Sequence, residues 1–334
     1  MIHWNEIHKR IEDANSIVLT THVNPDGDGL GSSVAMYYHL VEMKKDCRIF
    51  IVTPLPEEYQ FLNKNNIISC YDKKTDDTWI QNADLALIFD VGDFKRMKNV
   101  GELLSVNDIP MINIDHHPIR ENSPFLTNAV DTSVAATGEL VYDYFNTVRK
   151  NAITMEMWEG LYTAVVTDTG SFAYSNTTIK CHQIAMDAIQ AGVNPATIHQ
   201  RIYESNPIEK LRLLSKILHN VQLDCNGEFA WFTIDEKMMQ SVGANKTHVD
   251  GFTDMVRSIN GVEVAMMIFE NEDSCRVNLR SKGKYIVNTI ALELGGGGHK
   301  LACGAVVRGR LDEVLPRVLE LTKSEIAEQN GMKL

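Results

Sequence analysis

Histidines and aspartates gather at a few points in the first half of the chain. They occur in a turn-like stretch, THVNPDGDGLG, at the ends of two apolar runs, ADLALIFD and PMINIDHH, and in the block TDTGSF. The residues are His22, Asp26, Asp28, Asp90, Asp115, His116, His117 and Asp168. Crowded carboxylates raise one another's pKa unless a cation neutralises them, so divalent metal ions are the simplest explanation for such a cluster.

The number and type of these residues also indicate which metals to expect. There are many aspartates for a single ion, so two ions bridged by one carboxylate fit better, as in two-metal hydrolytic sites. Aspartate and histidine ligands without thiolate favour Mn²⁺, with Mg²⁺, Fe²⁺ and Co²⁺ as competitors, over a structural Zn²⁺ site.

Each motif also has a purely structural explanation. Asp-Gly-Asp-Gly is common turn chemistry, and Asp26 or Asp28 could simply cap a following helix. Asp90, taken alone, could be a loop aspartate. Asp115, His116 and His117 are harder to explain in this way, because three ionisable groups after an apolar strand cost free energy without a structural return.

The elements that must position these residues follow an α/β pattern. SIVLTT, CRIFIVT, ADLALIFD and PMINIDHH are short apolar runs separated by helical periodicity, which is typical of βαβ units and a parallel sheet. In three of these runs the polar cluster comes just after the strand, where open α/β sheets bind their ligands. We expect a helix over GLGSSVAMYYHLVEMK and another over WEGLYTAVV that ends near Asp168.

The pattern changes after residue 190. Residues 191–225 contain prolines and a long polar-faced helical stretch, and we expect a helical linker there. Beyond it, FAWFTI, VEVAMMIF and SCRVNLR predict strands, and VNTIALEL and LDEVLPRVLELTKSEIAEQ predict helices, with a turn or kink at Pro316. We therefore expect an α/β domain over 1–190, which carries the aspartate and histidine motifs, and a smaller α/β domain over 226–334.

A second candidate site lies in the predicted C-terminal domain. GGGGH, which ends at His299, follows a predicted helix, and its glycine amides could form a nest for an anion. A flexible turn explains a glycine run equally well, but Arg280 and Ser281 end the strand upstream, and an arginine fork suits a phosphate. The candidate substrate-binding residues are Arg280, Ser281, Gly296, Gly297, Gly298 and His299.

Composition limits the classes of function. The 334 residues carry 32 Lys and Arg against 44 Asp and Glu, a net charge of −12, which argues against a protein that coats long nucleic acid. A small anionic substrate remains compatible. The six cysteines are scattered singly, and no apolar run reaches the length of a membrane span, so we expect reduced thiols and a soluble, cytoplasmic protein.

In their order along the chain, the motifs His22-x-x-x-Asp26-x-Asp28, Asp90, Asp115-His116-His117 and Thr-Asp168-Thr-Gly resemble those of the DHH phosphoesterase superfamily. The resemblance implies that His22, Asp26 and Asp90 hold one metal ion. It implies that Asp28, Asp90, His116 and Asp168 hold the other, with Asp90 as the bridge. Asp115 would orient its neighbouring histidine, and His117 would face the substrate phosphate, as a phosphate ligand or as a general acid.

The pair Arg280-Ser281 and GGGGH resembles the DHH-associated C-terminal domain of the branch with nanoRNases that also act on 3′-phosphoadenosine 5′-phosphate. The resemblance spans nearly the whole chain, although Ala302-Cys303-Gly304 replaces the usual Ala-Ala-Gly. It implies that the domain over 1–190 is catalytic, with the active site in the cleft between the two domains. It also implies an Mn²⁺-dependent hydrolase of short oligoribonucleotides and 3′-phosphoadenosine 5′-phosphate, with a homodimer left open.

Other functions compete with this one. A linear or cyclic dinucleotide phosphodiesterase belongs to the same branch. An inorganic pyrophosphatase of the superfamily shares the metal motifs but lacks GGGGH, and a RecJ-like exonuclease would need further domains. A non-enzymatic nucleotide-binding regulator would need a broken metal set, and no ligand position in this chain is replaced.

Overall fold

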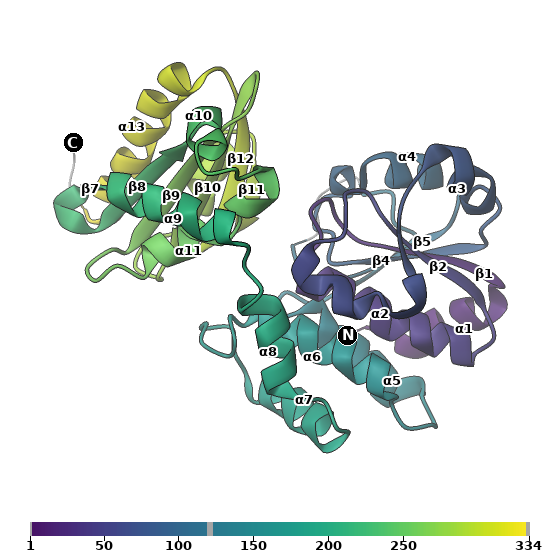
Figure 1. Ribbon diagram of the computed structural model, residues 1–334. Coiled ribbons are helices and arrows are strands. Elements are labelled where there is room, and N and C mark those ends of the chain that lie inside the picture. The colour runs from purple at the N-terminus through teal and green to yellow at the C-terminus, as the bar shows by residue number, and fades with distance from the viewer. Residues whose placement is uncertain (1, 119–122, 332–334) are drawn as a thin grey trace. The chain divides into compact units, whose positions relative to one another are not determined.

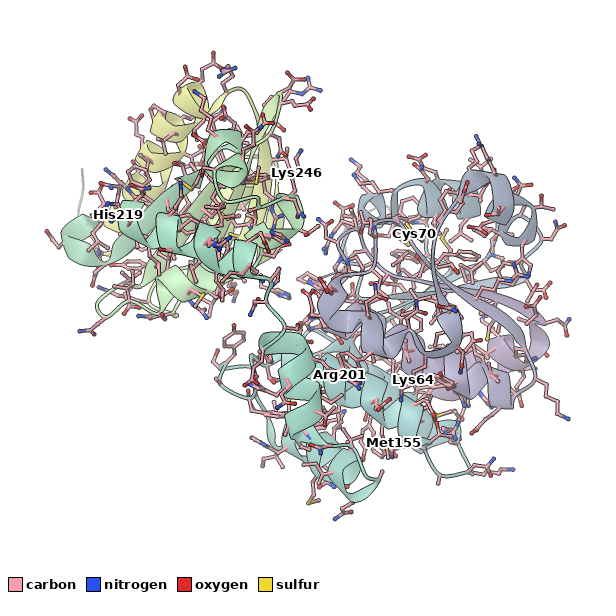
Figure 2. The ribbon with its side chains drawn as sticks, in the orientation of Figure 1. Lys64, Cys70, Met155, Arg201, His219 and Lys246 are labelled. Atoms are coloured by element: carbon pink, nitrogen blue, oxygen red, sulfur yellow. The ribbon has the colours of Figure 1, made fainter. Side chains whose placement is uncertain are left out.

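The computed structural model describes residues 2–118 and 123–331 and divides the chain into two compact units, 1–205 and 206–334. The division falls inside the segment expected to be a linker. Helix α8 (Pro195–Tyr203) packs into the core of the first unit through Ile198, whereas α9 (Ile208–Asn220) packs into the second through Leu213 and Ile217. The expected linker over 191–225 is therefore wrong, because its two helices bury apolar residues in different cores. Figure 2 labels Arg201 on α8 and His219 on α9.

The first unit is built on a parallel sheet with the strand order β3-β2-β1-β4-β5-β6. The strands are β1 (Ser16–Thr20), β2 (Asp46–Ile51), β3 (Ile68–Cys70), β4 (Leu85–Phe89), β5 (Met111–Asp115) and β6 (Thr127–Val130). The four apolar runs predicted to be strands are confirmed as β1, β2, β4 and β5. The order reverses between β1 and β4, which is the position where open α/β sheets bind ligands.

Helices cover both faces of this sheet (Figure 1). Those on one side are α1 (Trp4–Asp13), α2 (Gly27–Glu42), α5 (Thr137–Val148), α6 (Met155–Asp168) and α7 (Ile179–Gln190), and those on the other are α3 (Lys73–Ile80) and α4 (Lys98–Val106). Ile17 and Leu19 of β1 belong to the first core, and Val18 between them belongs to the second, because alternate residues of a strand face opposite sides. Burial on both faces explains why the predicted strands are continuously apolar.

The second unit contains a mixed sheet with the order β11-β12-β10-β9-β8-β7, in which β8 and β9 are parallel and the other pairs antiparallel. Its strands are β7 (Gln222–Asp224), β8 (Phe229–Ile234), β9 (Val264–Glu270), β10 (Ser274–Ser281), β11 (Gly297–His299) and β12 (Ala302–Arg308). Helices α12 (Asn288–Glu293) and α13 (Leu311–Gln329) pack on one face, and α9, α10 (Glu236–Gln240) and α11 (Phe252–Arg257) pack on the other. The predicted α/β class of both domains is confirmed.

Two further expectations concern single features. Helix α13 runs through Pro316 without ending, although we expected a turn or kink there. Val314 and Val318, on either side of the proline, are both buried in the core, and this packing offsets the hydrogen bond that proline cannot make. No helix in the described parts of the chain has the length and apolar character needed to cross a bilayer.

Candidate active site

The aspartates and histidines of the first unit meet at the carboxyl edge of the sheet, around the reversal between β1 and β4. His22 follows β1, Asp90 follows β4 directly, and Asp115 is the last residue of β5. Parallel strands end at the same edge, so residues far apart in sequence become neighbours there. The Nε2 atom of His22 lies 3.2 Å from Oδ2 of Asp90.

The turn after β1 combines the two roles that its sequence left open. Asp26 is the N-cap of α2, and its Oδ1 accepts hydrogen bonds from the amides of Asp28 and Gly29, both at 3.2 Å. Its other oxygen, Oδ2, lies 3.5 Å from Nε2 of His22. A helix cap and a metal ligand therefore need not be alternatives at Asp26, because each carboxylate oxygen can serve one of them.

The Asp28 side chain is fully buried and meets the N-terminus of α5. Its oxygens accept hydrogen bonds from the amides of Thr137 at 2.7 Å and Gly138 at 2.9 Å. The first amides of a helix have no partner within the helix and favour an anion, so α5 stabilises and orients this carboxylate. The sequence around Asp28 does not indicate this relationship, since α5 comes more than a hundred residues later.

Glycines after β1 let α2 approach its neighbours. A Cβ atom at Gly29 would lie 2.1 Å from Oγ1 of Thr21, and one at Gly27 would lie 2.5 Å from the side chain of Thr167. These glycines are needed for close packing, and neither is among the residues with positive φ. The packing of Gly27 on Thr167 brings the start of α2 to the end of α6, where Asp168 lies.

The second set of predicted ligands converges on His116. Its Nε2 atom lies 3.2 Å from Oδ2 of Asp168, 3.5 Å from Oδ1 of Asp90 and 3.6 Å from Oδ2 of Asp28. Asp28, Asp90 and His116 are buried, whereas a quarter of the Asp168 side chain is exposed. The structure thus brings together all six residues that the resemblance assigned to metal binding.

Asp90 lies at the centre of the cluster, and its carboxylate contacts His22 on one side and His116 and His117 on the other. One oxygen faces His22, and the other, Oδ1, lies 3.5 Å from His116 and 3.2 Å from Nδ1 of His117. This Oδ1 is buried, yet it accepts no well-formed hydrogen bond from the described residues. A buried carboxylate oxygen without such a bond is costly, and a cation would satisfy it. Nitrogen and oxygen donors without sulfur fit hard divalent ions, so the residues fit a metal pair.

The electrostatics show how strongly the site needs positive charge. Burial alone would lower the pKa of His22, but Asp26 and Asp90 raise it to about 10. Burial also opposes the charged form of His116, and Asp90, Asp168 and Asp28 raise its pKa to about 10.

The aspartates respond in different directions. Burial, then the charges of Asp90 and Asp168, raise the pKa of Asp28 well above its ordinary value. Burial, the larger effect, raises the pKa of Asp168 to about 7, against the opposing charge of His116. The pKa of Asp90 is held well below its ordinary value by His116, His117 and His22, although burial opposes this. Metal ions at such a site would bind in exchange for protons.

His117 is held by Asp115. Oδ1 of Asp115 accepts a hydrogen bond from the His117 amide at 3.0 Å and lies 2.8 Å from its Nδ1. We expected Asp115 to orient its immediate neighbour, His116, and these contacts instead go to His117. Burial would lower the pKa of His117, but Asp115 and Asp90 raise it to about 11. With Nδ1 facing a carboxylate, His117 can carry a proton at Nε2.

Arg96 contacts the cluster, although it was not predicted from the sequence. It lies in the 3₁₀ helix η3 (Phe94–Met97), and its Nη2 atom is 2.9 Å from Nδ1 of His22. The Val23 carbonyl lies 2.8 Å from the same nitrogen, and the Val23 amide donates to the Arg96 carbonyl. These contacts fix the ring of His22 from behind and place a cation beside the cluster. An arginine six residues after a strand-end aspartate was the available signal.

In the second unit, Arg280 extends from β10 beside α11. Its Nε lies 3.6 Å from Oδ2 of Asp254, and Arg257 binds the other oxygen of that carboxylate at 3.2 Å. Ser281 is buried, and its Oγ accepts a hydrogen bond from the Gly283 amide, a placement that favours a structural role. Of the predicted pair Arg280 and Ser281, Arg280 therefore remains the candidate phosphate ligand, and its side chain is half-buried.

The glycine run differs from the expected open loop. The amides of Gly295 and Gly296 donate to carbonyls of α12, as at many helix ends, and Gly297–His299 form strand β11 along β12. A Cβ atom at Gly296 would lie 2.1 Å from the carbonyl oxygen of Gly304. Close strand packing is therefore one reason for these glycines. His299 is exposed.

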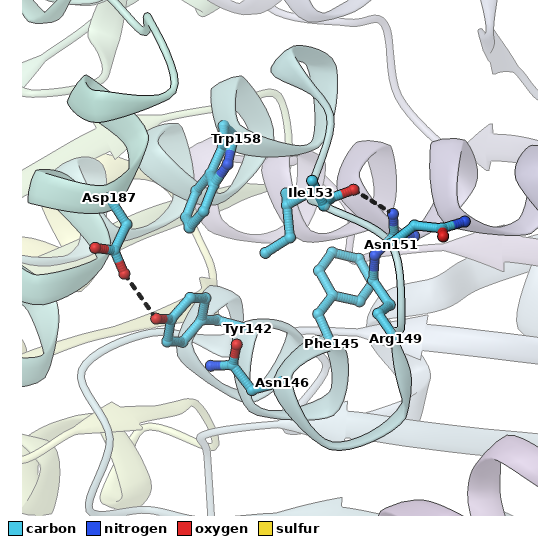
Figure 3. Close-up of a pocket in the computed structure, with 9 residues that line it drawn as sticks. Tyr142, Phe145, Asn146, Arg149, Asn151, Ile153, Trp158 and Asp187 are labelled. Atoms are coloured by element: carbon cyan, nitrogen blue, oxygen red, sulfur yellow. Dashed lines mark hydrogen bonds between the residues drawn. The ribbon is translucent and has the colours of Figure 1, made fainter.

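A cavity of about 300 Å³ lies elsewhere in the first unit (Figure 3). Tyr142, Arg149, Trp158 and Asp187 are among its lining residues, and Tyr142 donates a hydrogen bond to Asp187 at 2.8 Å. None of the predicted site residues lines this cavity. The cluster at the sheet edge is therefore the site to which the sequence motifs point.

A parallel sheet that gathers aspartates and histidines at its strand-order reversal, followed by a mixed-sheet unit, is the architecture of a DHH-type phosphoesterase. Residues 16–165 match the DHH family, N-terminal domain, and residues 235–328 match the DHHA1 domain. The chain belongs to the DHH family and is a hydrolase of phosphodiester or phosphate bonds, as the resemblance implied.

One named relative and several solved structures are similar to this chain over nearly its whole length. The chain is 30% identical to the bifunctional oligoribonuclease and PAP phosphatase NrnA of Thermus thermophilus, over 96% of this chain and 93% of that one. An exopolyphosphatase-related protein from Bacteroides fragilis superposes with a TM-score of 0.88 at 26% identity, covering 97% of this chain and 96% of that one. RecJ of Thermus thermophilus in complex with Mn²⁺ shares the fold, with a TM-score of 0.52 at 12% identity, covering 97% of this chain and 54% of that one.

Proposed function

We propose that this protein is an Mn²⁺-dependent phosphoesterase that hydrolyses short oligoribonucleotides and 3′-phosphoadenosine 5′-phosphate. The observation that carries the proposal is the position of Asp90, whose two carboxylate oxygens face separate groups of ligand side chains. Similarity along nearly the whole chain to a relative named for these two activities supports the choice of substrates.

In this proposal His22, Asp26 and Asp90 hold one ion, and Asp28, Asp90, His116 and Asp168 hold the other. Two bound ions would activate the attacking water and stabilise the charge on the phosphoryl oxygens. Asp26 and Asp28 are ordered by the first amides of α2 and α5, so their carboxylates need little rearrangement before binding. Fe²⁺, Co²⁺ and Mg²⁺ fit the same donors.

His117 is the proposed proton donor to the leaving oxygen. Asp115 holds its Nδ1, which leaves Nε2 to deliver a proton. In a short RNA the leaving group is the ribose oxygen of the neighbouring nucleotide, and hydrolysis transfers the phosphoryl group to water. Arg280 and His299 of the second unit are proposed to bind the remainder of the substrate through its phosphates.

A substrate panel tests this function. Purified protein with Mn²⁺ is incubated with two- to five-nucleotide RNAs, linear and cyclic dinucleotides, 3′-phosphoadenosine 5′-phosphate and pyrophosphate. We expect mononucleotides from the short RNAs, and AMP with phosphate from 3′-phosphoadenosine 5′-phosphate. Chelation should stop both reactions, and restoring Mn²⁺ should recover them. Hydrolysis of pyrophosphate alone, or of cyclic dinucleotides alone, would contradict the proposal.

A further inference from the structure

The first unit has a second cavity, and the loop residues that line it begin three residues after the proposed ligand Asp168. Its volume is about 380 Å³, and it is lined by residues of α6, of the following loop and of α8. Ser171 and Phe172 come from the loop, Tyr162 comes from α6, and Tyr203 ends α8. All lining residues belong to the unit that carries the metal cluster.

The cavity and the metal cluster share the C-terminal end of α6, the helix that ends at Asp168. Val166, two residues before Asp168, and Ser171, three residues after it, both line the cavity. Asp168 is also the most exposed of the three carboxylates around His116, so it is the one that a substrate can reach from solvent.

The lining has the chemistry of a site for a flat aromatic group. The rings of Tyr162 and Phe172 lie 6.4 Å apart in an edge-to-face arrangement, and those of His199 and Tyr203 lie 5.0 Å apart. Polar side chains, Gln200 and Glu204, lie on the exposed rim. Aromatic walls with a few polar groups at the edge are what a nucleobase requires, since its faces stack and its edge makes hydrogen bonds.

The loop that forms one wall has an unusual backbone. Gly170, Ser171 and Phe172 have φ values of 54°, 58° and 65°, and the left-handed region is unfavourable for the last two. The Ser171 amide donates to the Val166 carbonyl at 2.8 Å, and the Phe172 ring stacks on His182 at 5.0 Å. Such conformations persist where the surroundings enforce them and are concentrated at ligand sites.

We infer that the cavity lined by Tyr162, Phe172, His199 and Tyr203 binds the nucleobase of the nucleotide whose phosphate is hydrolysed at the metal cluster. The inference rests on the proposed function. It adds a base-binding subsite within the catalytic unit itself. A nucleotide should therefore bind more tightly than a sugar phosphate that lacks the base.

Calorimetric binding of two probes tests the inference. AMP and ribose 5-phosphate carry the same phosphate and differ in the base, and both are titrated into the Mn²⁺-loaded protein. We expect AMP to bind at least about ten-fold more tightly, and Tyr203→Leu to remove most of this difference by weakening AMP alone. Tyr203→Phe keeps the ring and should keep the preference. Tyr71→Leu, at a half-exposed tyrosine that does not line the cavity, is the matched control.

Other results would overturn the inference. Equal affinities of the wild-type protein for the two probes would do so, as would an equal loss of both in Tyr203→Leu. If Tyr203→Leu does not fold, His199→Ala, at an exposed lining position, should lower AMP affinity alone, and an unchanged ratio in that variant would contradict the subsite. Hydrolysis of bis(p-nitrophenyl) phosphate, which has no base, reports the metal cluster separately. Failure of the proposed function appears in the RNA panel, whereas failure of the subsite appears in the binding ratio.

Discussion

Gly31 of α2 and Gly160 of α6 pack backbone against backbone. A Cβ atom at Gly31 would lie 2.2 Å from the Gly160 carbonyl oxygen, and one at Gly160 would lie 2.5 Å from that of Gly31. The two helices approach as closely as glycine allows, and they carry Asp28 and Asp168 on the same side of His116. Helix packing therefore sets the ligand spacing.

Gly160→Ala should lower the free energy of unfolding by about 1–3 kcal/mol, because the added methyl group meets backbone that cannot move aside. Urea denaturation measures this change. Glu156→Ala, on the same helix and half-exposed, is the control and should change stability little. Full stability of Gly160→Ala would mean that the helices can separate without cost.

Asp90→Asn should leave a folded protein that has lost at least about 100-fold in hydrolysis, since even residues behind a ligand cost 10–100-fold. Calorimetric titration with Mn²⁺ should show weaker binding of both ions. Asp93→Asn alters a nearby aspartate that caps η3 and should retain binding. Loss of only one ion in Asp90→Asn would exclude a shared ligand.

His117→Gln should slow hydrolysis of a dinucleotide by roughly 100- to 10,000-fold, as expected for loss of a general acid. The effect on bis(p-nitrophenyl) phosphate should be much smaller, because p-nitrophenolate leaves without a proton. The ratio of the two kcat values is the measurement. A rise in KM with similar losses on both substrates would instead identify His117 as a phosphate ligand.

His39 should make the stability depend on pH. It is buried, Arg149 lies 2.7 Å from its Nδ1, and burial followed by that charge lowers its pKa from 6.5 to about 3. Between pH 6.5 and 3 the unfolded chain binds a proton that the folded chain refuses, so stability falls as pH falls. The loss is about 2 kcal/mol between pH 7 and pH 5.

His39→Gln keeps an acceptor for Arg149 and should remove this contribution. The comparison is the slope of unfolding free energy against pH in wild type and variant. His3→Gln, at an exposed histidine, should leave the slope unchanged apart from small effects. Parallel slopes for wild type and His39→Gln would contradict a neutral buried His39.

Arg280→Ala should raise KM for a dinucleotide by roughly 10-fold, because a charged hydrogen bond to phosphate contributes about 1.5–3 kcal/mol. Hydrolysis of bis(p-nitrophenyl) phosphate should change far less. Arg310→Ala, at a strongly exposed arginine of the same unit, serves as the control. Equal losses on both substrates would place Arg280 in the chemistry rather than in binding.

The main strands of the first unit could be predicted from the sequence. Apolar runs that end in Asp90 or Asp115 indicated both the parallel sheet and the edge where the ligands meet, because parallel strands share that edge. The hydrogen bonds from Thr137 and Gly138 to Asp28 could not be predicted, because the sequence around the two residues does not indicate a partner so far away in the chain.

The misjudged features share a cause. The stretch over 191–225 and the glycine run each have a local composition that fits a linker or an open loop. Ile198, Leu213 and Ile217 show that the helices of the first segment belong to cores, and Gly296 shows that the second meets another strand. In both segments, contacts with residues far away in the sequence determine the structure, and local composition does not reveal those contacts.

The backbone at Asp90 narrows what evolution or design can place there. With φ at 59°, the position suits glycine, asparagine and aspartate, and it penalises branched or bulky residues. Glycine would keep the shape and lose both oxygens, and glutamate would add length at a strained position. Among relatives that retain hydrolysis we expect aspartate at this site almost without exception, while inactive descendants should drift first to asparagine or glycine.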